Sequence, residues 1–401
     1  MAQSEPPRRE GLLTGLTADT VKLTIASLFS DVATEMLYPV LPVFLTQTLR
    51  AGGSIVGLVE GVAEATQNLV QGLSGAVSDK LRRRKPVAIV GYVIAALAKP
   101  LIGLSGAWPG VLGSRFVDRL GAGIRSAPRD ALIAGSADAA HRGKAFGMEG
   151  VGDNAGAFIG PLIAVAFLTL WPGTLRPIFY LAVIPGLLAM VMVLLVKESE
   201  APAKVEAKVK LDTPLPRFPR PYLRYLAASA LFGLGNSSNA FLILRTRDLG
   251  ASLPQTILIY AGFNLVAALA SYPAGAMSDR LGRRNILALG LVVFFASYVG
   301  FGLSRDPAVI AGLFLLYGLF QGVFRAAGKT LAVDLAPAEL RASGVGWYGA
   351  AVGLSGLIAS VVAGLLWDRI GHPAVFLYGA VFAVVGIVAL LLLVAPDRRS
   401  A

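Results

Sequence analysis

The chain has 401 residues, of which 55% are hydrophobic and only 15% charged, and its mean hydropathy is +0.67. A soluble protein needs about a quarter of its residues charged to cover its surface, and a disordered chain holds far fewer apolar residues. The composition therefore excludes both classes and indicates a membrane protein.

A net charge of +12 raises the question of a nucleic-acid partner. The basic residues, however, form short clusters between apolar runs rather than one continuous face, so we expect none. The chain has no Cys and only two His, and it lacks a Walker-type phosphate loop. We therefore expect neither an enzyme nor a metal site, and no cofactor.

Apolar runs of about 20 residues, the length that crosses a bilayer, recur along the chain. The first follows a polar segment, residues 1–21, and is expected to be an anchor and not a cleaved signal peptide. We count twelve candidate spans, centred near residues 34, 66, 97, 122, 157, 186, 234, 265, 295, 321, 355 and 383.

The spans divide into two bundles of six, residues 22–197 and 222–394, joined by a linker, 198–221, that is rich in Lys, Arg and Pro. A short tail, 395–401, ends the chain. With the N-terminus inside, roughly 20 Lys and Arg lie in cytoplasmic segments. Six lie outside: Arg50, Arg176, Arg245, Arg247, Arg305 and Arg369. This bias predicts that both termini are cytoplasmic.

An internal repeat supports the two bundles. Residues 75–84, GAVSDKLRRR, match residues 275–284, GAMSDRLGRR, at seven of ten positions with an offset of 200, and Arg125 and Arg325 share this offset. Duplicated bundles joined by a linker are typical of secondary transporters.

Three motifs carry a resemblance that covers essentially the whole chain. The pattern G-x-x-x-D-R-x-G-R-R is present at Gly275, Asp279, Arg280, Gly282, Arg283 and Arg284, and in a changed form at Gly75, Asp79, Lys80, Arg83 and Arg84. The pattern R-x-x-Q-G-x-G-x-G is present in part at Arg115, Gly121 and Gly123, with Asp118 and Arg119 replacing Gln and Gly. The third pattern is a series of glycines, Gly152, Gly156 and Gly160, followed by Pro161.

On these motifs the chain resembles the major facilitator superfamily, and within it the drug:proton antiporter branch. The resemblance implies an all-α membrane protein with 12 transmembrane helices in two six-helix halves. It also implies gating roles for the motif residues. Gly152, Gly156 and Gly160 would give a flat face for close helix approach, and Asp79 would hold the start of span 11 near Ser343. Asp279 would do the same at the start of span 5.

Ionisable residues are concentrated in spans 1 to 5. At about 2.5 to 3.5 kcal/mol for each central charge, eleven lipid-facing charges would cost on the order of 30 kcal/mol, so they must face a cavity or each other. Four are bases: Lys99, Arg115, Arg119 and Arg125. Seven are acids, the candidate proton-coupling residues: Asp31, Glu35, Glu60, Glu64, Asp118, Glu149 and Asp153.

Seven acids against four bases leave three excess carboxylates, which favours proton exchange. Asp31 and Glu35 are the primary candidates because they lie near the midplane of span 1; a permanent salt bridge to Arg119 or Arg115 is the alternative. Arg125, Arg129, Asp130, Glu149 and Asp153 are expected to form an ion network near the cytoplasmic side. In the second half the cavity wall is expected to be mostly neutral. The candidate substrate-binding residues are Arg115, Arg119, Asn236, Asn239, Tyr260, Asn264, Tyr317 and Gln321.

The sequence thus predicts a proton-coupled secondary transporter that exports small amphipathic organic compounds by alternating access. Two alternatives stay open: uptake of an organic anion bound by Arg115, Arg119 and Arg125, and efflux of a hard divalent cation through the acids. The expected partners are a small-molecule substrate, protons and the lipid bilayer of a bacterial inner membrane, with the protein acting as a monomer.

Overall fold

The computed structural model describes residues 15–81, 83–137, 141–197, 215–337 and 340–395; the side chains of residues 75–81, 216 and 342 lie outside this description. The described chain is helical throughout. The first bundle contains α1 (Ala18–Glu35), α2 (Leu41–Val43), η1 (Phe44–Thr48), α3 (Gly53–Leu81), α4 (Arg84–Leu104), α5 (Trp108–Gly135), α6 (Arg142–Leu170), α7 (Arg176–Leu181) and α8 (Val183–Leu194). The second contains η2 (Leu215–Arg217), α9 (Arg220–Gly233), α10 (Ala240–Asp248), α11 (Leu253–Leu281), α12 (Arg283–Leu303), α13 (Pro307–Val323), η3 (Phe324–Gly328), α14 (Lys329–Leu335), α15 (Arg341–Arg369) and α16 (His372–Leu393).

Local sequence signals account for several helix ends. Thr17 and Thr20 form a capping box at the start of α1, and Ser252 and Gln255 form another at the start of α11. In each box the side chains satisfy backbone N–H groups that have no partner inside the helix. Gly282 has φ 88° between α11 and α12, a conformation that favours glycine. Gly282, a residue of the loop motif, therefore forms the turn that joins α11 to α12.

Among the described residues, eight helical runs are long and apolar enough to cross a membrane: α4, α6, α7 with α8, α11, α12, α13 through α14, α15 and α16. The other four predicted spans correspond to α1 through η1, α3, α5, and α9 with α10. They carry more polar residues or breaks, so the count of twelve stays a prediction. The predicted all-α membrane fold is confirmed.

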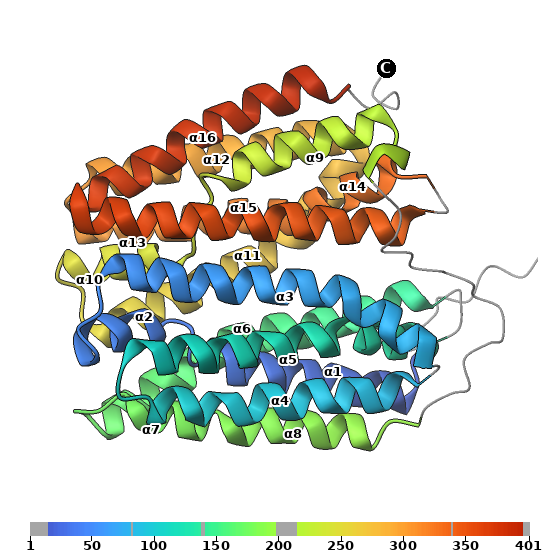
Figure 1. Cartoon of the computed structure of the whole chain (residues 1–401), viewed down its shortest axis with the longest axis horizontal. Coiled ribbons are helices and arrows are strands. Elements are labelled where there is room, and N and C mark those ends of the chain that lie inside the picture. The colour runs from blue at the N-terminus through green and yellow to red at the C-terminus, as the bar shows by residue number, and fades with distance from the viewer. Residues whose placement is uncertain (1–14, 82, 138–140, 198–214, 338–339, 396–401) are drawn as a thin grey trace, which may run out of the picture.

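The helices run side by side along the long axis of the molecule, with the first bundle below and the second above in Figure 1. We call the end at which α1 begins, α8 ends and α9 begins the linker end, and the opposite end the far end. Figure 1 shows the linker end on the right, where the C-terminus also lies.

The two bundles have different interiors. Most large, fully buried side chains of the second bundle are aromatic, and Phe294 contacts Tyr298, Tyr317 and Phe320 with ring centroids 3.9 to 5.9 Å apart. The first bundle instead buries charged residues, among them Arg115. The uneven charge distribution in the sequence therefore corresponds to two chemically different cores.

At the far end the bundles are packed together by α3 and α15. The carboxylate of Asp368 accepts hydrogen bonds from the backbone N–H groups of Gly53 (2.7 Å) and Ser54 (2.9 Å) at the start of α3. A Cβ atom at Gly57 would lie 2.0 Å from the backbone oxygen of Ser360, so only glycine permits this approach. Buried Leu244 of α10 adds to an apolar cluster with residues of the first bundle, such as Phe44. The far end is closed.

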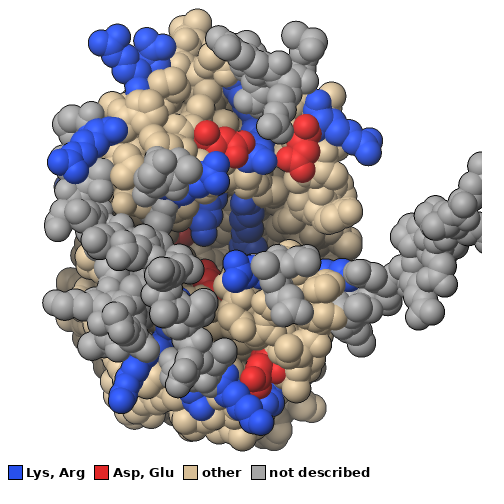
Figure 2. All heavy atoms as spheres, turned by 90° about the vertical axis from the view of Figure 1, so that its right-hand side faces the viewer, with Lys and Arg blue, Asp and Glu red and all other residues tan. Residues whose placement is uncertain are grey.

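The linker end differs. Figure 2 faces this end and shows a hollow between the bundles, in which basic side chains are visible. The structure is thus closed at the far end and open toward the linker end.

Candidate functional site

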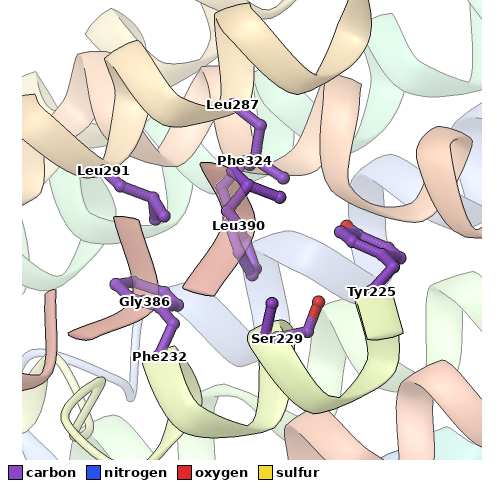
Figure 3. Close-up of a pocket in the computed structure, with 9 residues that line it drawn as sticks. Tyr225, Ser229, Phe232, Leu287, Leu291, Phe324, Gly386 and Leu390 are labelled. Atoms are coloured by element: carbon purple, nitrogen blue, oxygen red, sulfur yellow. The ribbon is translucent and has the colours of Figure 1, made fainter. Parts of the chain in front are cut away.

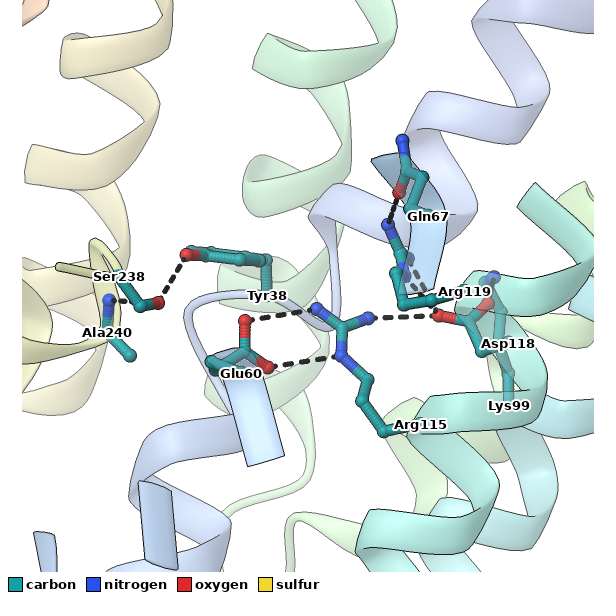
Figure 4. A network of polar contacts seen from close by, with 9 residues as sticks. All are labelled: Tyr38, Glu60, Gln67, Lys99, Arg115, Asp118, Arg119, Ser238 and Ala240. Carbon is teal, nitrogen blue, oxygen red and sulfur yellow. Dashed lines mark hydrogen bonds and ion pairs between the residues drawn. The ribbon is translucent and has the colours of Figure 1, made fainter. Parts of the chain in front are cut away.

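A buried ion network lies on the facing sides of α3, α4 and α5 (Figure 4). Arg115 donates two hydrogen bonds to Glu60, from Nε to Oε1 (3.1 Å) and from Nη2 to Oε2 (3.3 Å), and a third from Nη1 to Oδ2 of Asp118 (2.9 Å). All three residues are at most 2% exposed. A two-pronged guanidinium–carboxylate pair is among the strongest polar contacts and fixes both side chains.

Asp118 is the centre of the same network. It also pairs with Lys99 (Nζ to Oδ1, 2.6 Å) and Arg119 (Nη2 to Oδ2, 2.7 Å), and Arg119 donates to Gln67 (3.0 Å). Three cations thus face two anions, Glu60 and Asp118, so the network carries one excess positive charge. Removing one partner of such a buried set leaves an uncompensated charge, which is strongly destabilising. Glu60 and Asp118 therefore have fixed partners.

Glu35, at the end of α1, connects the two bundles. Its Oε2 atom accepts a hydrogen bond from the hydroxyl of Tyr260 on α11 (2.8 Å), and Asn264 Nδ2 lies 3.5 Å away. The ring of Tyr260 stacks on Tyr38, with centroids 5.4 Å apart, and Tyr38 bonds Ser238 across the interface (3.1 Å). These contacts lie next to the ion network, as Figure 4 shows for Tyr38 and Ser238.

Glu35 has no salt bridge among the described residues. The cations that act on it electrostatically are Arg325, Arg119 and Arg115, and none of them lies within ion-pair distance of it. The alternative of a fixed salt bridge from Arg115 or Arg119 to the span-1 acids is wrong for this conformation, because both arginines pair with Asp118 instead.

The carboxylates of two further acids have no hydrogen bond or ion pair in the described part of the chain. Asp31 is half-buried on α1, and the charges that face it are Asp153, Glu35, Arg125 and Arg129. Glu64 is exposed on α3, where a Cβ atom at Gly356 of α15 would lie 3.6 Å from its Oε2. These carboxylates can exchange protons without breaking a salt bridge.

The ion network predicted near the linker end is present around Arg129. Its guanidinium pairs with Glu149 (3.0 Å) and Asp130 (3.1 Å) and lies 3.8 Å from Asp153, and Glu149 also accepts a hydrogen bond from Ser27 (3.0 Å). Arg125 is not part of it; its guanidinium lies over the ring of Tyr92, 4.5 Å from the centroid.

Metal ligation finds no support in the described residues, where no three His, Asp or Glu side chains come together as a metal site would require. The alternative of divalent-cation efflux therefore has no ligand set in this part of the chain.

Comparisons with known proteins decide the family. The model of the Major Facilitator Superfamily matches residues 23–244 and 225–401. The chain belongs to the Major Facilitator Superfamily. An uncharacterized MFS-type transporter of Methanocaldococcus jannaschii is 33% identical over 383 residues, which cover 94% of this chain and 95% of the relative. A tetracenomycin C resistance and export protein of Streptomyces glaucescens is 30% identical over 155 residues, 38% of this chain and 29% of its own length.

A solved D-xylose-proton symporter has the same fold as this superfamily member. Its TM-score is 0.75 at 16% identity, and the match covers 95% of this chain and 98% of the symporter. The family, the fold and the conclusion that the protein is a membrane transporter and not an enzyme are thus established.

Some of the predicted substrate-binding residues lie at the interface between the bundles, and others lie inside the second bundle. Asn236 and Gln321 are half-buried, whereas Tyr260 and Tyr317 are at most 3% exposed and pack in the aromatic core. The Tyr317 hydroxyl donates to Asn239 (2.9 Å), and Asn264 donates to the backbone oxygen of Ala157 on α6 (3.1 Å). In this conformation Tyr260 and Asn264 contact the first bundle, whereas the bond between Tyr317 and Asn239 lies within the second.

The motif residues of the gating prediction are only partly described. The burial of Gly75 and the side chain of Asp79 lie outside the description, so the predicted contact of Asp79 with span 11 stays a prediction. Asp279 is exposed and contacts Arg283 (3.4 Å), which also pairs with Asp334 (2.5 Å). No hydrogen bond or ion pair joins Asp279 to α6 among the described residues.

The basic residues of the first motif copy lie at the same end. Arg83 is exposed, and Arg84, which is partly buried, points its Nη1 toward the backbone oxygen of Ala131 on α5 at 3.5 Å. Arg84 thus contacts the bundle that contains it, as Arg283 contacts Thr330 in the second bundle (3.2 Å).

The glycine face of α6 packs against α1 within the first bundle. A Cβ atom would lie 2.5 Å from the backbone oxygen of Thr24 at Gly152, 2.5 Å from that of Leu28 at Gly156 and 2.9 Å from that of Val32 at Gly160. Pro161 follows and is buried. The close helix approach implied by the motif is therefore present on the side of α1.

We expect Gly152→Ala to destabilise the protein by about 1 to 3 kcal/mol, because the added methyl group would push two helix backbones apart. The melting temperature of the purified variant in detergent measures this. Gly150→Ala on the same helix is the control, since a Cβ atom there meets nothing within 4 Å. Equal melting temperatures for the two variants would contradict the steric explanation.

Sequence reasoning missed Asp368, which closes the far end. The sequence contained a weak signal for it: Asp368 lies next to Arg369 at the end of one span, and another span starts near Gly53. A carboxylate at a helix N-terminus is stabilising, but only the structure shows which helix it reaches.

A small cleft inside the second bundle is not the transport site. It is lined by apolar residues, with the hydroxyl groups of Tyr225 and Ser229 at one side (Figure 3). Its residues come from α9, α12, η3 and α16. It therefore does not lie between the bundles, where alternating access places a substrate.

Proposed function

We propose that the protein is a proton-coupled secondary transporter that exports small amphipathic organic compounds by alternating access. One observation carries this proposal: three acids, Asp31, Glu35 and Glu64, have no salt bridge among the described residues, and Glu35 and Glu64 lie next to the second bundle. A group that exchanges protons and also contacts both bundles, as Glu35 does, can couple its charge to their relative position.

The proposed orientation places the linker end in the cytoplasm. The excess of Lys and Arg in the segments at that end supports it. The structure would then be the cytoplasm-open form in a bacterial inner membrane, with residues 22–197 and 222–394 moving as two bodies in a monomer. Glu60, Asp118 and Glu149 would act in this scheme as fixed charges, because each has a basic partner.

The direction of transport rests on the relatives. The name of the Streptomyces glaucescens protein states resistance and export, and the α6 glycine motif is typical of antiporters in the branch that the chain resembles. Proton-coupled uptake of an organic anion is the second candidate, and exposed Arg325 and Lys329 favour it.

Reconstitution tests the proposal. In proteoliposomes loaded with an amphipathic dye such as ethidium or a naphthalene carboxylate, we expect an imposed pH gradient to drive dye movement, and a protonophore to abolish it. Dye movement toward the acidic compartment supports export by exchange for protons. Dye movement with the protons would support the uptake alternative, and no gradient-dependent movement of any compound would reject proton coupling.

A further inference from the structure

Two cations of the second bundle, Arg325 and Lys329, have no partner within the described part of the chain. Arg325 and Lys329 are exposed, and among the described residues neither makes a hydrogen bond or an ion pair. Arg325 lies ten residues before the end of α14 at Leu335, about 15 Å along a helix. An arginine at this depth facing lipid would cost several kcal/mol, so its exposed surface must belong to the hollow.

Electrostatics place Arg325 on the side of the interface. Its charge acts on Glu35 of α1, which belongs to the other bundle. It also lies within η3, a π-helical turn between α13 and α14, and such turns occur frequently at functional sites. Figure 2 shows basic side chains inside the hollow at this end.

The repeat explains why these cations are unpaired. With the offset of 200, Arg325 and Lys329 correspond to Arg125 and Arg129. In the first bundle Arg129 is neutralised by Glu149 of α6, and Arg125 is covered by the ring of Tyr92. The helix that corresponds to α6 in the second bundle is α15, and from Arg341 to Trp367 it contains no acid.

The same positions therefore hold a closed ion network in one bundle and two open positive charges in the other. Two like charges four residues apart repel each other on a helix, so the arrangement is unfavourable until an anion joins it. Neither Arg115 nor Arg119 can serve instead, because both are held by Asp118.

We propose that Arg325 and Lys329 bind an anionic group of the substrate, a carboxylate or a phosphonate. This inference rests on the proposed transport function and names its substrate class. The guanidinium offers two parallel N–H donors to such a group and the ammonium adds a second charge.

The test uses three naphthalene compounds of similar size: 1-naphthoate, neutral 1-naphthamide and cationic 1-naphthylmethylammonium. Each is titrated against the full-length protein in detergent, with binding measured by calorimetry and by the shift in melting temperature. We expect naphthoate to bind the unchanged protein at least about tenfold more tightly than the amide, and Arg325→Gln with Lys329→Gln to remove this preference.

Three controls make the result specific. Arg305→Gln removes an exposed charge at the far end and should leave naphthoate binding unchanged. Arg325→Lys keeps the charge and should retain most of the preference for naphthoate. Lys329→Gln alone should reduce this preference, and it replaces the double variant in the test if the double variant does not fold. The proposal is overturned if the amide or the amine binds as tightly as naphthoate, or if the preference survives the double substitution.

Transport is measured separately in proteoliposomes. Proton-driven movement of neutral or cationic compounds, without a preference for naphthoate, would retain the transport function and reject the anion site. Preferential naphthoate binding without proton-driven movement of any compound would retain the anion site and reject the proton-coupled transport function.

Discussion

Replacement of Glu35 by Gln is expected to remove the pH dependence of transport while the protein still folds. As a carboxylate, Glu35 accepts the hydrogen bond from Tyr260 and attracts Asn264, and both belong to the other bundle. A hydrogen bond to a charged group contributes about 1.5 to 3 kcal/mol. Protonation weakens this contact, so acid should favour separation of the bundles at this point. Because Gln carries no charge, the variant should behave at all pH values as the unchanged protein does in acid.

Transport in proteoliposomes between pH 5.5 and 8 measures this effect. One titrating group changes a rate by up to about tenfold per pH unit, and the profile of Glu35→Gln should be flat. Tyr260→Phe is the matched control, because it removes the donor but keeps the carboxylate and should keep a pH dependence. Asp31→Asn, in a chain that keeps Glu35, should weaken the pH dependence that the unchanged protein shows. If both acid variants show the profile of the unchanged protein, proton coupling does not occur at these residues.

Replacement of Gly57 by Ala is expected to prevent closure of the far end. The new Cβ atom would lie 2.0 Å from the Ser360 oxygen and 2.8 Å from the Ser360 carbonyl carbon. Both atoms are backbone, so no side-chain rotation relieves the clash. Overpacking of this kind costs about 1 to 3 kcal/mol, which shifts the equilibrium toward far-end-open forms by roughly 5- to 150-fold. Transport should fall by a similar factor, because the cycle requires both forms.

The absence of Cys allows a direct measurement. Leu244 is 5% exposed at the far end, so Leu244→Cys should react with a membrane-impermeant maleimide only when that end opens. Labelling should be faster in the Gly57→Ala background. Gly72→Ala on the same helix is the control, since its Cβ atom would meet only the Cα atom of Gly346, at 3.7 Å. Equal labelling rates in the Gly57→Ala and Gly72→Ala variants would show that the close approach of α3 and α15 at Gly57 does not control closure of the far end.

The family and the helical architecture could be predicted from the sequence, because apolar runs, the repeat and the loop motif are local patterns. That Glu60 faces other charged groups was also expected from the cost of a charge in lipid, and in the structure it bonds Arg115 of α5. Local patterns could not show which acids have partners. Glu60 and Asp118 proved to be paired, whereas Glu64, one turn from Glu60, is not.

The partners of Asp368 and Glu35 could not be predicted for a different reason. Both contacts join residues more than 200 positions apart, and they form only where two bundles meet. The sequence also could not show which helix packs against the glycine face of α6. The spacing of Gly152 and Gly156 predicts a flat helix face, but only the structure shows that α1 covers it. That Arg325 has no ion pair among the described residues became clear only when its surroundings were compared with those of Arg125.

The charge network around Asp118 also constrains how the protein is made. Helix α5 contains Arg115, Asp118, Arg119 and Arg125, and inserting four unpaired charges from the translocon into lipid would cost roughly 12 kcal/mol. This helix is absent from the eight described runs that are apolar enough to insert alone. Its entry into the bilayer should therefore wait for α3 and α4, which supply Glu60 and Lys99. During synthesis α3, α4 and α5 must accordingly assemble as a group, whereas most second-bundle helices can leave the translocon one at a time.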